Sequence, residues 1–174
     1  MTNPQVSLEN GLILAYDART LSSSKDASGL STAQPTYTLS AHDGGATALD
    51  INPHIRGCIA TGGMDKMVKI WNVSDEETEG VAGRKREVSL ATSRDLGLGK
   101  IFTARWNPDP EAPLTLAAAG SKATVQVWDV ASNPGARKAF GERIKRHGRE
   151  LGEVKKSGGV VQLNHGDNDD EEED

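Results

Sequence analysis

The stretch ATGGMDKMVKIWNV, residues 60–73, decides the fold when it is taken together with the Ala41-His42 pair that precedes it. Four polar side chains stand at the spacing of a loop, a strand, a turn and a second strand: His42, Thr61, Asp65 and Trp71. Burying an imidazole, a hydroxyl and an indole N–H is costly unless each group finds a hydrogen-bond partner. The spacing therefore predicts a buried polar network whose role is structural.

Apolar runs that close on an aromatic residue recur along the chain. The runs are GLILAYD, MVKIWN and TVQVWD, and they place Tyr16, Trp71 and Trp128 at intervals of 55 and 57 positions. Together with the hairpin signal at Asn10-Gly11, this pattern resembles the blades of WD-repeat proteins. The resemblance predicts an all-β fold of antiparallel hairpins over residues 1–130.

The interval between repeats exceeds the roughly 40 to 45 residues of a minimal blade. Two segments with loop-like composition, 21–35 and 74–87, account for the excess. The repeats supply two full units and the tail end of a third, whereas propellers close with about four to eight blades. We therefore expect a partial β-propeller, the C-terminal part of a larger ring that needs further blades to close, because an open stack leaves unpaired strand edges.

Residues 131–156 are expected to form a basic amphipathic helical segment that starts at Asn133-Pro134. One stripe of this helix gathers Phe140, Ile144, His147 and Leu151, and most basic side chains point away from it. Two interpretations stay open at this point. The basic face either contacts RNA phosphates by sequence-independent attraction, or it is solvated while the apolar stripe docks on the propeller.

Residues 157–174 are expected to form a disordered acidic tail, because GDNDDEEED cannot bury apolar area. Such a tail either binds basic proteins or shields the neighbouring basic segment and favours solubility.

The second full unit departs from the four-residue pattern. Ser93 or Arg94 stands where a counterpart of His42 is expected, and Lys122 or Ala123 replaces the aspartate. We expect packing to hold this unit, with exposed loops and strand ends free to recruit partners. The candidate contacts to RNA or to a protein partner are Arg143, Lys145, Arg146, Arg149, Arg94, Lys100, Arg105 and Lys122.

Thr61, His42 and Asp65 also carry the groups of a nucleophilic set. A working nucleophile needs an exposed oxygen and a nearby oxyanion site, whereas this spacing buries the set within a blade. The sequence predicts no enzyme activity, no catalytic, cofactor-binding or metal-binding residues, no small-molecule substrate and no membrane segment. Its single cysteine, Cys58, is expected to be a buried thiol.

The segment ATSRDLGLGKIFTARWNPDPEAPLTLAAAGSKATVQVWDVASN, residues 91–133, resembles the last repeat of the periodic tryptophan protein 1 family. The stretches GGMDKMVKIWNV and RKAFGERIK share this resemblance, which covers most of residues 1–145. It implies a noncatalytic WD-repeat scaffold of the nucleus and nucleolus that acts in large ribosomal subunit assembly and pre-rRNA processing. Its partners would be preribosomal proteins and pre-rRNA. The alternative on the same fold is a chromatin-associated or ubiquitin-ligase adaptor.

Overall fold

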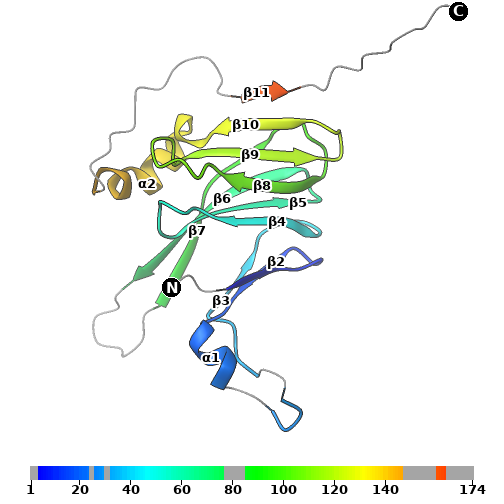
Figure 1. Ribbon diagram of the computed structural model, residues 1–174, viewed down its shortest axis with the longest axis vertical. Helices are drawn as coiled ribbons and strands as arrows, with labels where there is room; N and C mark the ends of the chain where they lie inside the picture. The colour runs from blue at the N-terminus through cyan, green and yellow to red at the C-terminus, as the bar shows by residue number, and fades with distance from the viewer. Residues whose placement is uncertain (1–3, 24–25, 30–31, 77–84, 147–159, 164–174) are drawn as a thin grey trace, which may run out of the picture.

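The computed structural model describes residues 4–23, 26–29, 32–76, 85–146 and 160–163. Within them the strands form three antiparallel sheets that lie one beside the next (Figure 1). The first sheet has the order β1 (Gln5–Ser7), β2 (Leu12–Ala15) and β3 (Tyr37–Ser40). The second has the order β4 (Ala46–Ile51), β5 (Cys58–Gly63), β6 (Met67–Glu76) and β7 (Lys85–Asp95). The third runs from β8 (Ile101–Trp106) through β9 (Thr115–Gly120) and β10 (Val125–Asp129) to β11 (Val160–Leu163).

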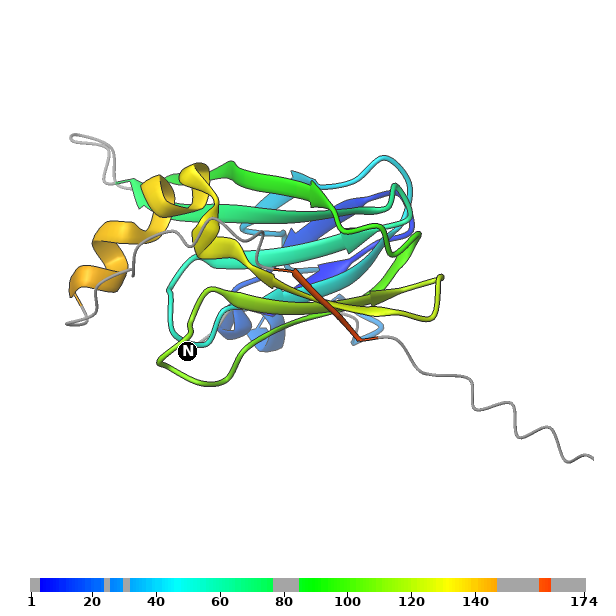
Figure 2. The ribbon, with the colours of Figure 1, turned by 90° about the horizontal axis from the view of Figure 1, so that it is seen from above.

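The predicted fold class is confirmed: the described chain consists of antiparallel blade-like sheets with few helices. The three-stranded first sheet is the tail end of a unit, and the two four-stranded sheets are the full units. Seen from above, the three sheets overlap, with the first lying behind the other two (Figure 2).

The same turn joins two neighbouring strands in each sheet. Gly11, Lys66 and Ala123 occupy it, and all three have positive φ angles of 83°, 69° and 55°. In each case the backbone N–H donates to the carbonyl three residues earlier, at 3.1 to 3.2 Å. Gly11 adopts this conformation without steric cost, whereas Lys66 and Ala123 adopt it only because the flanking strand pairs determine it.

Burial shows that the second sheet lies between the other two. Every residue of β5 is buried, whereas buried and more accessible residues alternate in β2 and β10. One apolar cluster, which includes Ile13, Ile59 and Trp71, joins the first sheet to the second. A larger cluster, which includes Ile70, Ile101 and Trp128, joins the second sheet to the third. The outer sheets therefore bury one face each against the middle sheet.

A short 3-10 helix, η1 (Val130–Ser132), and helix α2 (Pro134–Arg146) follow β10. The Asn133 side chain accepts hydrogen bonds from the N–H groups of Gly135 (2.8 Å) and Ala136 (3.4 Å), so it caps the helix ahead of Pro134. Ala136, Phe140 and Ile144 are buried and belong to the larger apolar cluster. The apolar stripe of α2 therefore docks on the blades.

Two expectations about loops and one about the tail need correction. Helix α1 (Ala18–Ser23) extends into the predicted loop 21–35. Strands β6 and β7 take up both ends of the predicted loop 74–87, because their pairing continues outward as far as Glu76 and Lys85. Residues 160–163 of the expected disordered tail form β11, because the exposed edge of β10 offers backbone partners to this short apolar run. Residues 164–174 lie outside the described residues, as do His147 and Leu151 of the predicted stripe. Among the described helices, none has the length and apolar character needed to cross a membrane.

Candidate functional site

The four residues of the predicted network meet on the second sheet. Thr61 lies on β5 and Trp71 on β6, while His42 follows β3 and Asp65 lies in the β5–β6 turn. Trp71 Nε1 donates to Thr61 Oγ1 at 2.9 Å, and His42 Nε2 lies 2.8 Å from the same oxygen. His42 Nδ1 lies 2.9 and 3.0 Å from the two carboxylate oxygens of Asp65.

The donors and acceptors of this hydrogen-bonded network can be assigned from its two end members, Trp71 and Asp65. An indole N–H only donates and an ionised carboxylate only accepts. His42 therefore carries its proton on Nδ1 and donates to Asp65, which leaves Nε2 to accept from the Thr61 hydroxyl. The series of hydrogen bonds runs from Trp71 through Thr61 and His42 to Asp65, so the indole, hydroxyl and imidazole groups all have partners.

Burial and charge favour the same protonation states. Burial lowers the pKa of His42 below its usual value, although the neighbouring Asp65 acts in the opposite direction. Partial burial acts to raise the pKa of Asp65, but the hydrogen bonds from the Met67 N–H and from His42, with the charge of Lys69, hold that pKa below its usual value. A neutral imidazole next to an ionised carboxylate satisfies both tendencies.

Lys69 ties the network to the adjacent strands. Its Nζ lies 3.4 Å from a carboxylate oxygen of Asp65 and donates to the Ala41 carbonyl at 2.7 Å. The Met67 N–H donates to the same carboxylate at 3.1 Å, which fixes the β5–β6 turn. Sequence reasoning did not identify Lys69, although its position four residues after Asp65, within the same hairpin, was a usable signal.

Two glycines of β5 make room for the neighbours of this strand. A Cβ atom at Gly63 would lie 2.5 Å from the His42 ring, and one at Gly62 would lie 2.4 Å from a side-chain carbon of Ile101. The first glycine lets the imidazole reach Thr61, and the second lets the third sheet approach the second. Both lie at the end of β5, and the Gly63 carbonyl also accepts the Lys66 N–H of the β5–β6 turn at 3.2 Å.

Strand register corrects the predicted counterparts of the network in the third sheet. Ser93 and Arg94 lie on β7, where they pair with Lys69 and Val68. His42 lies two residues after β3, and the position two residues after β7 is Gly97. The prediction failed because β7 extends to Asp95, farther along the chain than the apolar pattern indicated.

The rest of the third sheet follows the same register. In the second sheet Trp71 pairs with Ile59, and Thr61 lies two residues after Ile59. In the third sheet Trp128 pairs with Leu116, and Ala118 lies two residues after Leu116. Ala118 is therefore the counterpart of Thr61. Lys122 precedes the positive-φ residue of the turn, where Asp65 stands in the second sheet. Trp128 is 1% exposed, and the guanidinium of Arg94 lies 5.9 Å from the centroid of its ring. Packing and this cation–π contact take the place of the polar network.

The candidate contact residues do not form one surface. Lys100 and Lys122 are exposed at the turn end of the third sheet. Arg105 is exposed on β8 and lies 3.4 Å from Asp50. Arg94 contacts Trp128, as described above. Grouping these residues from their charge alone did not take their positions along the strands into account.

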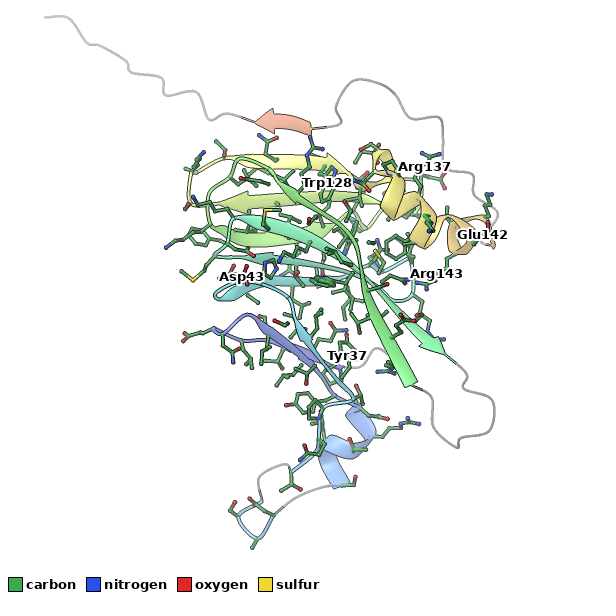
Figure 3. All side chains as sticks on the ribbon, turned by 180° about the vertical axis from the view of Figure 1, so that it is seen from behind. Tyr37, Asp43, Trp128, Arg137, Glu142 and Arg143 are labelled. Atoms are coloured by element: carbon green, nitrogen blue, oxygen red, sulfur yellow. The ribbon has the colours of Figure 1, made fainter. Side chains whose placement is uncertain are left out.

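The helical candidates lie at the other end of the third sheet (Figure 3). Arg143 donates to the Arg56 carbonyl at 2.8 Å and lies 5.9 Å from the centroid of the Phe140 ring, so it fastens α2 to the β4–β5 loop. Lys145 is exposed and lies 3.7 Å from Glu142. The Arg146 side chain and Arg149 lie outside the described residues.

Comparison with known proteins agrees with this architecture. Residues 33–72, which span β3 to β6 and include the whole network, match the family described as "WD domain, G-beta repeat". The chain is a WD-repeat protein, and proteins of this class generally serve as noncatalytic scaffolds that bind other proteins.

Its relatives are considerably longer than this chain. An uncharacterized WD repeat-containing protein of Schizosaccharomyces pombe is 37% identical over 158 residues, which are 91% of this chain and 25% of that protein. Periodic tryptophan protein 1 of Saccharomyces cerevisiae is 30% identical over 138 residues, 79% of this chain and 22% of that protein. The GATOR2 complex protein WDR24 of Homo sapiens is 29% identical over 90 residues, 52% of this chain and 10% of that protein. The chain thus spans about a quarter of the length of the first two relatives.

Proposed function

We propose that this chain is part of a noncatalytic WD-repeat scaffold that acts in large ribosomal subunit assembly and pre-rRNA processing, in the nucleus and nucleolus. The observation that carries the proposal is the similarity to periodic tryptophan protein 1, which extends over 79% of the chain. The proposed partners are preribosomal proteins and pre-rRNA.

The state of the Thr61 hydroxyl supports a scaffold over an enzyme. This side chain is 0% exposed, and its oxygen is engaged by both Trp71 and His42. A nucleophile must reach its substrate and be activated in contact with it. The network is therefore suited to holding a blade in shape, which keeps a binding surface rigid.

The two outer sheets support closure of the ring by further blades. Val125 of β10 and Phe102 of β8 are 38% and 59% exposed on the third sheet, and Val6 of β1 is 46% exposed on the first. In the described residues β1 pairs only with β2, and it borders a hollow of about 420 Å³ that β4 and β8 also line. We expect a strand from the remaining blades to pair with the free edge of β1.

The docked helix provides a fixed basic element for contact with RNA. Phe140 and Ile144 anchor α2 on the blades, while Lys138 and Lys145 stay exposed on its outer side. Phosphate contacts made by such side chains release counterions, so their strength depends steeply on salt. Docking of the stripe on the blades and RNA contact by the basic face are therefore compatible, although the sequence alone presents them as alternatives.

Affinity purification of the full-length protein, followed by identification of the bound RNA and proteins, tests the proposal. Enrichment of pre-rRNA and large-subunit assembly factors supports the ribosomal scaffold. Enrichment of chromatin or ubiquitin-ligase components without pre-rRNA would instead support the adaptor alternative.

A charge-reversal variant tests the role of the helix. Lys145, Arg146 and Arg149 are changed to Glu together, while Arg143 is kept because it fastens the helix. We expect weaker co-sedimentation with preribosomal particles, with the largest difference at low salt and little change in thermal stability. Replacing the same three residues with Lys or Arg, so that the charge is kept, is the matched control. Unchanged co-sedimentation of the Glu variant would assign the basic face to solvent.

A further inference from the structure

The outer face of the third sheet repeats the face of the second sheet on which the third sheet packs. On the second sheet, the strand pairs that receive the third sheet are Ala60 with Ile70 and Gly62 with Val68. The pairs at the same positions of the third sheet are Ala117 with Val127 and Ala119 with Val125. Small residues of one strand again lie beside β-branched residues of the next, and Val125 is 38% exposed. The outer face of the third sheet is therefore suited to receiving a further sheet.

The outer face of the first sheet is of the opposite kind, the face that a sheet turns toward the sheet before it. In the second and third sheets this face carries Trp71 and Trp128, each at the same distance after the positive-φ residue of its turn. In the first sheet Tyr16 takes this position after Gly11. The outer faces of the first and third sheets lie at opposite ends of the row of sheets (Figure 1). They are the two kinds of face that already meet twice within the chain.

The face of the first sheet is more apolar than its counterpart on the second. In the second sheet Thr61 of the polar network pairs with Lys69. In the first sheet the pair at this position is Val6 with Leu14, and Val6 is 46% exposed. Burying this face against another sheet leaves neither of these side chains in need of a hydrogen-bond partner.

Phe102 indicates which sheet the third sheet receives. It stands at a bulge of β8, and Thr47 stands at the same bulge of β4. The Thr47 hydroxyl donates to the Ile101 carbonyl of β8, the first strand of the sheet packed against it. Phe102 cannot donate such a hydrogen bond, and it is 59% exposed. An apolar side chain here suits an incoming sheet without a counterpart of β4 or β8, and the first sheet has none in the part of the chain that the structure describes.

We propose that two copies of this chain associate head to tail, with the first sheet of each copy docked on the third sheet of the other. Three sheets from each copy give six, within the range of about four to eight blades with which propellers close. Each contact joins two different faces, so the association is limited to a dimer only if the ring closes. In a longer protein a strand pairs with the edge of β1, whereas in this dimer Phe102 of the other copy covers that edge.

The proposal rests on the ring closure put forward above and names a second copy as the source of the further blades. It does not depend on the ribosomal role, which affinity purification tests separately. Analytical ultracentrifugation of the 174-residue chain measures the association. We expect a species of twice the chain mass of 18.5 kDa, with no larger species as the concentration rises. A monomer, or species that keep growing with concentration, would overturn the proposal.

A pair of charge variants tests which faces meet. Val6→Glu alters only the face of the first sheet, and Val125→Lys alters only the face of the third. We expect each variant alone to lose the dimer at concentrations at which the unaltered chain is dimeric. An equimolar mixture should regain it, because two unaltered faces meet at one contact and opposite charges meet at the other.

The same variants distinguish this arrangement from a contact between like faces. If third sheets packed on each other, Val125→Lys would lose the dimer, Val6→Glu would keep it, and the mixture would not recover, which would contradict the proposal. Lys138→Glu, at an exposed position of α2, is the control and should leave the dimer unchanged. Both altered valines are exposed, and circular dichroism checks that each variant keeps its fold.

Discussion

Trp71 of β6 and Thr61 of β5 lie diagonally across the strand pair, and the indole Nε1 donates to the threonine Oγ1 at 2.9 Å. Because the indole N–H occupies a lone pair of this oxygen, the hydroxyl donates its own hydrogen to His42 Nε2, and the imidazole is held with Nδ1 toward Asp65. The network therefore connects two strands, the turn between them and the loop that arrives from the first sheet.

Replacing Asp65 with Ala should lower the free energy of unfolding by about 1 to 3 kcal/mol, because the buried His42 Nδ1–H loses its acceptor. Denaturant unfolding of the full-length protein measures the change. Asp43→Ala, at an exposed position next to His42, is the control and should have little effect. An Asp65→Ala protein as stable as the wild type would show that the network does not hold the blade.

Stability should fall as the pH is lowered through the range just below 6.5. Because burial holds the pKa of His42 below its usual value of about 6.5, the unfolded chain takes up a proton that the folded chain resists. The contribution is fully present above that range and is lost below it. The lowered pKa of Asp65 acts with the same sign at more acidic pH. Urea unfolding at a series of pH values should show this fall in the free energy of unfolding in the wild type and in the control variant His54→Gln. The variant His42→Gln should lack the part of the fall that lies between neutral and mildly acidic pH.

Replacing Gly63 with Ala should destabilise the protein by roughly 1 to 3 kcal/mol, because the added Cβ would lie 2.5 Å from the His42 ring. A double-mutant cycle with His42→Ala measures the coupling between the two sites. Part of the cost should be recovered once the ring is absent. Fully additive effects would mean that the strain arises elsewhere.

Replacing Phe140 with Ala should lower the free energy of unfolding by about 3 to 5 kcal/mol, because its ring is 0% exposed within the cluster that joins α2 to the sheets. Lys138→Ala, on the exposed side of the same helix, should change stability by no more than about 0.5 kcal/mol. Thermal unfolding compares the two variants. Similar effects of both would indicate that α2 does not depend on the apolar stripe.

The isolated 174-residue chain should associate with itself in solution, because among the residues that the structure describes the first and third sheets each leave one face without a partner sheet, and β1 pairs on one side. Analytical ultracentrifugation against concentration measures this. Phe102→Ser, at a 59% exposed position of the third sheet, should reduce the association. A monomer with a sharp cooperative unfolding transition would argue against closure by further blades.

The strand content and the blade repeat could be predicted from the sequence because they depend on local patterns. The turns at Gly11, Lys66 and Ala123 recur at the interval of the aromatic residues, and each hairpin pairs residues close in the chain. The residues of the network lie within thirty positions of one another, so motif spacing is enough to bring them together. The start of α2 at Pro134 follows from its cap for the same reason.

The tertiary structure alone decided which candidate side chains stay available for partners. Arg94 lies against Trp128 of the next sheet, and Arg143 donates to the carbonyl of Arg56, which is 87 positions away. Val160 pairs with Trp128 although the whole of helix α2 lies between them in the sequence. A charged side chain on a strand or helix looks the same in the sequence whether or not a distant element lies beside it. Packing between sheets is set by non-local contacts. These contacts determined that Arg94 and Arg143 are held against other elements, whereas lysines such as Lys138 and Lys145 stay exposed.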